Sequence, residues 1–129
     1  MKILVPKPLV SGNLEILALT MKDDAEFRKH SENALHTLYR SAATTGDDFG
    51  FEADFDSGVL TIDFGKPNSR IVVSPHAATH QIWLSAAQQV QKLRWDVVEN
   101  AFVLDATGET LKELLEQAIS RQVGEYFSL

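Results

Sequence analysis

The chain contains no cysteine, and this absence removes several chemistries at the outset. Without thiols it forms no disulfide, ligates no iron–sulfur cluster through cysteine and offers no cysteine nucleophile. It also lacks an apolar run of the roughly 20 residues that a membrane-spanning helix needs. Pro6 and Pro8 interrupt the stretch where a signal peptide would be continuously apolar, so we expect a cytoplasmic location and no membrane partner.

Basic residues are scarce relative to acidic ones. The chain has 12 Lys and Arg residues and 18 Asp and Glu residues, which gives a formal net charge of -6. Nucleic acid is therefore an unexpected partner, whereas metal cations or a basic protein surface would fit. The chain also lacks a G-x-S-x-G elbow, a phosphate-binding glycine loop, an H-E-x-x-H motif and a dinucleotide fingerprint, so we do not expect an enzyme.

The periodicity of apolar residues predicts the order helix, several strands, helix. The first helix is expected from about Asp24 to Ala43, with Asp23 as its N-cap and Thr44–Gly46 as its end. The last helix is expected over residues 109–123, with Thr107 as cap, Gly124 as stop and the tail packed between the helices. Alternation between them predicts six strands, at 49–55, 59–64, 70–74 (ended by Pro75), 80–85, 92–96 and 101–104, with Gln88–Gln91 in a polar connection.

These elements predict an α+β fold of two layers. Hairpin-length connections imply an antiparallel sheet, and two amphipathic helices imply that the N- and C-terminal helices cover one face of it. We assign residues 21–129 to this domain. Residues 1–20 are expected to be an N-terminal extension, either a flexible arm, an added strand or a start-site artefact, because Met21 is a second plausible beginning.

The segment Gln81–Ser85 places a tryptophan on the open face of this sheet. Alternation puts Ile82 and Leu84 on one side of the strand and Gln81 and Trp83 on the other. On alternation alone, a loop or terminus could equally well cover Trp83. Because both helices take the opposite face, we expect Trp83 to be exposed, as an aromatic anchor for a partner protein.

Carboxylates are concentrated in two parts of the chain. If the first helix lies along the sheet edge near the first strand, some of them share one surface, and hard cations would relieve their repulsion. Such a surface would bind iron, calcium, magnesium or manganese through few protein ligands and many waters. The alternative is that they are solvated faces of an acidic protein. The candidate metal ligands are Asp23, Asp24, Glu26, Asp47, Asp48, Glu52 and Asp54.

Three motifs, in this order, resemble the frataxin family, in particular its bacterial branch. The resemblance runs from about Asp23 to the C-terminus. The three motifs are Asp56-Ser57-Gly58-Val59-Leu60-Thr61-Ile62, then Gln81-Ile82-Trp83-Leu84-Ser85, then Thr107-Gly108-Glu109-Thr110-Leu111 followed by Glu113-Leu114-Leu115-Glu116-Gln117-Ala118.

The resemblance implies two helices on an antiparallel sheet of five to seven strands, in a frataxin-like two-layer sandwich. It also implies a non-enzymatic, iron-binding accessory or regulatory protein of iron–sulfur cluster assembly. Such a protein docks on the cysteine desulfurase–scaffold complex and modulates assembly or supplies iron. Iron, as Fe²⁺ or Fe³⁺, would bind weakly on the acidic ridge of the first helix and first strand. The partner-binding strip would be Gln81, Ile82 and Trp83. The default state is a monomer, and the family allows metal-promoted oligomers.

Some positions depart from the family pattern. Tyr39–Thr44 has no carboxylate where the family continues its acidic run, so the ridge is thinned. Phe102 stands where a tryptophan is usual, and Gln88–Gln91 replaces a glycine-rich loop. Two alternatives therefore stay open: a metal-independent interaction module that uses the Trp83 face, and a ferroxidase-like, iron-storing oligomer.

Overall fold

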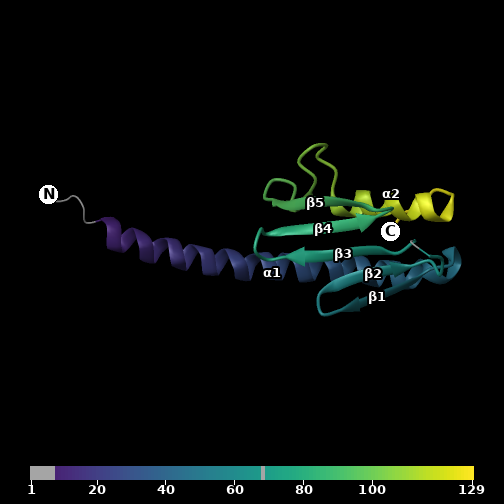
Figure 1. The fold of residues 1–129 in the computed structure, drawn as a ribbon, viewed down its shortest axis with the longest axis horizontal. Coiled ribbons are helices and arrows are strands. Elements are labelled where there is room, and N and C mark those ends of the chain that lie inside the picture. The colour runs from purple at the N-terminus through teal and green to yellow at the C-terminus, as the bar shows by residue number, and fades with distance from the viewer. Residues whose placement is uncertain (1–7, 68) are drawn as a thin grey trace.

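The computed structural model describes the backbone of residues 8–67 and 69–129, and the side chains of residues 24–67 and 69–129. Six antiparallel strands form one sheet in sequence order, and Figure 1 shows both helices on the same side of it, which confirms the predicted two-layer α+β fold. The elements are α1 (Pro8–Phe49), β1 (Glu52–Asp56), β2 (Val59–Asp63), β3 (Ile71–His76), β4 (Gln81–Ala86), β5 (Gln89–Asp96), β6 (Ala101–Val103) and α2 (Leu111–Val123).

Helix α1 is longer than predicted at both ends. It runs through Asp23, so the predicted N-cap there is wrong, and residues 8–20 are helical rather than an added strand. The predicted end at Thr44–Gly46 is also wrong, because the hydroxyls of Thr44 and Thr45 donate back to helix carbonyls at 2.9 and 3.1 Å and so remain compatible with the helix. The N-terminal part of α1 projects beyond the sheet (Figure 1). The division of the chain after residue 20 stays a prediction, and residues 1–7 lie outside the described part.

Three strand boundaries differ from the prediction by more than one residue. Phe49 ends α1, so β1 begins only at Glu52. Strand β3 continues through Pro75, which lies opposite Ile82, to His76. The predicted polar connection Gln88–Gln91 is mostly strand, because Ala87 and Gln88 form a two-residue turn with φ of 52° and 65°, and β5 begins directly after it.

Helix α2 has well-defined ends. Its N-cap is Thr110, not the predicted Thr107, and the hydroxyl of Thr110 and the carboxylate of Glu113 form a reciprocal capping box. The predicted stop is confirmed, since Gly124 has φ 78° and its N–H donates to the Ser120 carbonyl. These caps fix where the tail leaves the helix.

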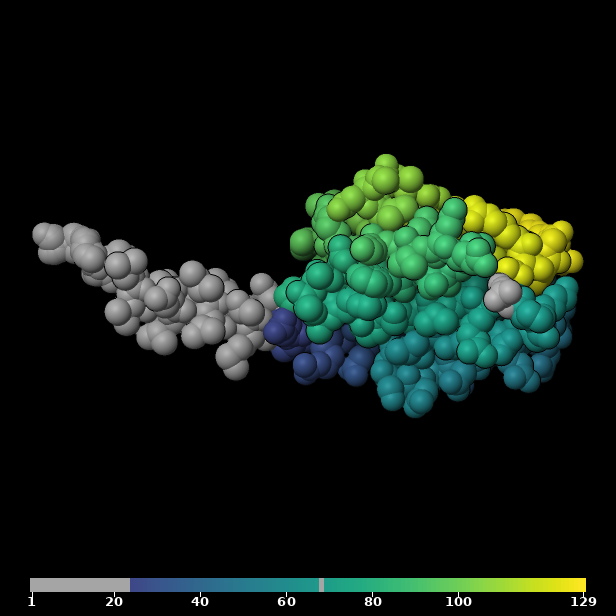
Figure 2. All heavy atoms as spheres, in the orientation of Figure 1, coloured from purple at the N-terminus to yellow at the C-terminus, as the bar shows by residue number. Residues whose placement is uncertain are grey.

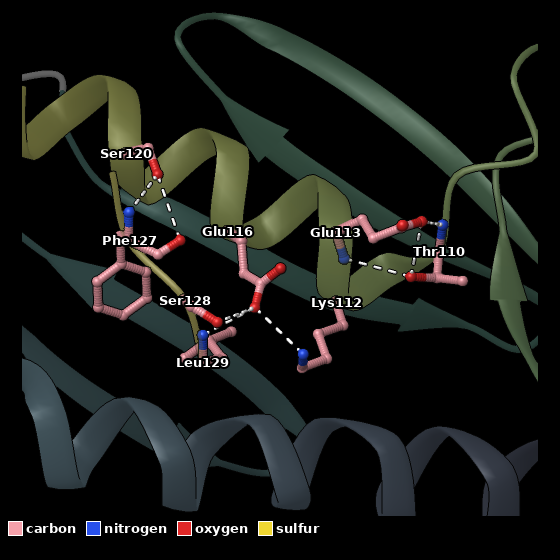
Figure 3. Close-up of polar contacts among 8 residues, drawn as sticks. All are labelled: Thr110, Lys112, Glu113, Glu116, Ser120, Phe127, Ser128 and Leu129. Carbon is pink, nitrogen blue, oxygen red and sulfur yellow. Dashed lines mark hydrogen bonds and ion pairs between the residues drawn. The ribbon is translucent and has the colours of Figure 1, made fainter. Parts of the chain in front are cut away.

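The C-terminal tail packs between the two helices, as predicted. Phe127 is buried and its ring meets Phe49 at the end of α1, with the ring centroids 4.8 Å apart. The Phe127 N–H donates to the Ser120 hydroxyl at 3.0 Å, and the Leu129 N–H donates to the Glu116 carboxylate at 2.8 Å (Figure 3). The tail thereby closes one end of the groove between α1 and α2.

The core lies between the helices and the inward face of the sheet. It contains the following fully buried side chains: Leu35, Leu60, Ile62, Ile71, Val73, Ile82, Leu84, Leu93, Phe102, Leu115 and Ile119. The alternate residues of the same strands therefore face away from the helices.

Candidate functional site

The open face of the sheet carries Trp83. Figure 2 shows this side in the orientation of Figure 1, and strand residues form most of the surface turned to the viewer. Trp83 lies opposite Ser74 of β3 and Lys92 of β5. Ile82, which was predicted to contact a partner, is fully buried and points into the core, so only its backbone is available on this strand.

The indole of Trp83 is half-buried by side chains of both neighbouring strands. His76 stacks on it with ring centroids 3.6 Å apart and an interplanar angle of 18°, and the Lys92 Nζ lies 4.5 Å from the ring centroid. The Trp83 Nε1 donates to Gln81 Oε1 at 3.0 Å. These contacts hold the ring in one orientation, so a partner would meet a fixed aromatic surface flanked by a cation and an imidazole.

Charge changes sign across the open face. Strand β1 places Glu52, Asp54 and Asp56 on it, whereas β5 places Lys92 and Arg94 there. Arg94 pairs with Asp105 at 2.5 Å, but Lys92 makes no ion pair with any described side chain. A partner with a basic region facing β1 and an acidic region facing β5 would match this pattern.

The predicted metal residues do not form one cluster. Asp24 and Glu26 lie at the end of the sheet near the β3–β4 turn, where Asp24 pairs with His80. Asp47 and Asp48 lie in the last turn of α1, at the opposite end. Among the side chains from 24 onward that the structure describes, no three His, Asp or Glu residues are arranged to hold a metal ion, and the side chain of Asp23 lies outside them.

Two residues of the predicted ridge share a surface hollow, although no three described carboxylates there are arranged as a metal site. Asp47 and Glu52 line a surface hollow between the end of α1 and the β1–β2 hairpin, and Asp63 also lines it. Asp63 was not among the predicted metal ligands, although the hairpin register, which places Glu52 opposite it, could have identified it. The N–H of Gly65, and then the guanidinium of Arg70, hold the pKa of Asp63 below its usual value. The donors are exposed carboxylates, which suit a weakly held, hydrated cation rather than a fixed metal centre.

Two histidines make contacts between the sheet and α1. The Nε2 of His80 bonds to Asp24, and its ring stacks on Phe27 of α1 with centroids 5.3 Å apart. His30 of α1 stacks on Trp95 with centroids 3.8 Å apart. Both histidines therefore hold α1 against the sheet.

The fold and the open face with Trp83 together define a structural class. The chain is a two-layer α+β protein with two helices on one face of a six-stranded sheet and an aromatic residue held on the other. It belongs to the frataxin-like family, since the family model for the frataxin-like domain matches residues 20–125.

A solved structure shows the same fold. It is a frataxin from Psychromonas ingrahamii, described as a model for stability modulation within the CyaY protein family. The two chains are 19% identical and superpose with a TM-score of 0.64 over 81% of this chain and 95% of the other.

The family as a whole has a role in iron–sulfur cluster assembly. It is associated with iron, interacts with assembly proteins and is generally non-enzymatic. Within the described part of this chain, neither helix has a stretch apolar enough to cross a membrane.

Proposed function

We propose that this chain is an iron-binding accessory or regulatory protein that docks on the cysteine desulfurase–scaffold complex through its open sheet face. The observation that carries the proposal is Trp83, which is held on that face by His76 and Lys92. Aromatic residues flanked by polar groups supply much of the binding energy in protein interfaces. Pre-ordering the ring lowers the entropy lost on docking.

Iron is cargo in this proposal rather than a resident cofactor. The hollow lined by Asp47, Glu52 and Asp63 supplies carboxylate oxygens, which are hard ligands suited to iron. Because these groups are exposed, they would release the ion readily to a partner with better ligands. A cytoplasmic location and a monomeric state remain part of the proposal.

A Trp83→Ala variant tests the docking surface. We expect its affinity for a purified desulfurase–scaffold complex to fall about thirtyfold, which corresponds to an interface hot spot of about 2 kcal/mol. Val98→Ala is the matched control, because Val98 is also apolar and 91% exposed but lies in the β5–β6 loop. Isothermal titration measures both affinities, and circular dichroism checks that both variants fold. Unchanged affinity in a folded Trp83→Ala protein would refute the proposed face.

A metal-independent interaction module is the second candidate. The separation of the acidic residues between two ends of the fold favours it, since no described group of three donors is ready for a metal. Both candidates use the Trp83 face, and they differ only in whether iron binds at defined carboxylates. An iron titration therefore separates them.

A further inference from the structure

A cleft of about 610 Å³ opens between α1, the β5–β6 region and the start of α2. Its volume lies in the range of roughly 300–1,000 Å³ that is typical of small-molecule sites. Its walls include the apolar side chains Leu38, Trp95, Phe102 and Leu111. The cleft lies on the helix side of the molecule, whereas Trp83 is on the open face, so the two sites are independent.

The cleft continues the groove that the C-terminal tail fills at its other end. The tail places Phe127 between the helices, and Leu129 lines a smaller hollow that it shares with Thr37. Thr37 also lines the cleft. In Figure 3 the tail lies between α2 and α1 beside Lys112, which lines the cleft. Beyond this point the cleft is open, and the buried side chains of Leu38, Phe102 and Leu111 form its floor.

The ionisable residues that line the cleft are basic, whereas the chain as a whole is acidic. Its lining includes Lys29, Lys112 and His30 but no Asp or Glu, although the protein has a formal net charge of -6. Lys112 pairs with Glu116 at 3.2 Å, so its charge is partly compensated. Lys29 makes no ion pair with any described side chain, so its ammonium can pair with an external anion.

We propose that this cleft binds a small amphipathic carboxylate with an alkyl or aromatic body. The apolar body packs against the half-buried Ala34 and Trp95, where it removes the apolar surface that is still exposed in the cleft from water. The carboxylate pairs with Lys29 at the rim, where it remains partly hydrated. A neutral or cationic ligand of the same shape lacks this ion pair and binds more weakly.

Trp95 reports directly on occupation of the cleft, because it is part of the wall. In a Trp83→Phe background it is the sole tryptophan. We expect decanoate, titrated below its micelle concentration, to change the Trp95 emission saturably and to raise the melting temperature. Decanol and decylammonium serve as the neutral and cationic controls and should bind several-fold more weakly. Absence of a saturable change with decanoate, or equal binding of all three, would overturn the proposal.

Two pairs of variants locate the binding. Lys29→Glu should weaken decanoate binding about tenfold, since it replaces attraction with repulsion, whereas Lys66→Glu makes the same charge change in the exposed β2–β3 turn. Ala34→Leu extends a side chain into the cleft and should also weaken binding. Ala43→Leu makes the same change at an exposed position of α1. Each variant is first checked for an intact fold by circular dichroism. Equal affinities in either pair would show that decanoate binds elsewhere and would overturn the assignment.

Discussion

The ring of Trp83 owes its orientation to residues on two other strands. His76 is at the end of β3 and Lys92 is in β5, and both contact the indole across the sheet. Cross-strand contacts of this kind are the sheet's equivalent of neighbouring turns on a helix. His76 therefore sets the orientation in which the indole ring of Trp83 faces solvent on the open face.

Removing His76 should loosen Trp83. We expect His76→Ala to lower the free energy of unfolding by about 1 kcal/mol, the usual contribution of a stacked aromatic pair, and to make the indole more accessible to acrylamide. His76→Phe keeps a ring against Trp83 and should restore most of both properties. Urea denaturation and fluorescence quenching, with Trp95→Phe in every protein to isolate Trp83, provide the measurements. Similar behaviour of the Ala and Phe variants would show that the stack contributes nothing.

The sequence could place Trp83 and Gln81 on the open face, but not the stacked ring of His76 beside them. Strict alternation around Ile82, together with the helix–strands–helix order, was sufficient to assign the tryptophan to the open face. His76 was missed because Pro75 was expected to end the strand, whereas β3 passes through it. The contact of His80 with Asp24 could not be predicted either, because His80 lies in a turn with φ of 53°, and side-chain contacts across a turn leave no periodic signal.

At the scale of elements, the C-terminal tail is fastened to α2 by Glu116. Burial alone raises the pKa of Glu116, but the hydrogen bonds from the Leu129 N–H, Lys112 and Ser128 outweigh it, so the pKa lies below its usual value of 4.5. A carboxyl group whose pKa is lowered by folding contributes stability above the unfolded-state pKa, and loses it as the pH falls through the folded-state pKa. The tail contact is therefore complete at neutral pH and is lost in acid.

We expect Glu116→Gln to be less stable than the parent protein at neutral pH. The difference in melting temperature should shrink as the pH falls from about 4.5 through the lowered pKa of Glu116 in the folded protein, because below that pKa both proteins are neutral at this position. Glu125→Gln is the control, since Glu125 is exposed and makes no described ion pair. Thermal unfolding followed by circular dichroism across this pH range gives the comparison. A Glu116→Gln difference that is constant with pH would mean that the carboxylate charge does not hold the tail.

The residues at which the helices begin and end were harder to predict than the existence of the helices. Asp23–Glu26 has the composition of a helix start and Thr44–Gly46 that of a helix end, yet α1 runs through both. Such residues favour caps only when their side chains bond to free backbone groups, and here Thr44 and Thr45 bond back within the helix. Helix α2 was easier because Gly124 adopts the left-handed conformation that glycine favours.

At the scale of the whole molecule, the acidic residues are divided rather than pooled. Asp24 and Glu26 lie near the β3–β4 turn, and Asp47, Glu52 and Asp63 gather at the other end of α1. Composition revealed the excess of acid but not its distribution, because α1 separates residues that were expected to share one ridge. The exposed position of Trp83 on the open face could be predicted from the order of elements, whereas the arrangement of carboxylates depends on three-dimensional contacts.

This distribution predicts where iron binds. In an anaerobic Fe²⁺ titration followed by NMR, amides around Asp47 and Glu52 should broaden first, since both carboxylates line that hollow and make no described ion pair, whereas Asp63 beside them pairs with Arg70. Asp24 already pairs with His80, so its surroundings should respond at higher iron concentration. The affinity should be weak, because the ligands are exposed and the ion keeps most of its waters.

A pair of double variants makes the test specific. Asp47→Asn with Glu52→Gln removes two charges from the hollow and should abolish its response, because Asp63 alone is a weak ligand. Glu99→Gln with Glu125→Gln removes the same net charge from exposed positions that do not line the hollow, and should leave the response unchanged. If the parent protein shows no site-specific broadening at millimolar iron, the metal-independent module is the correct function. In that case the Trp83→Ala experiment still tests docking through the open face, because the two surfaces are tested separately.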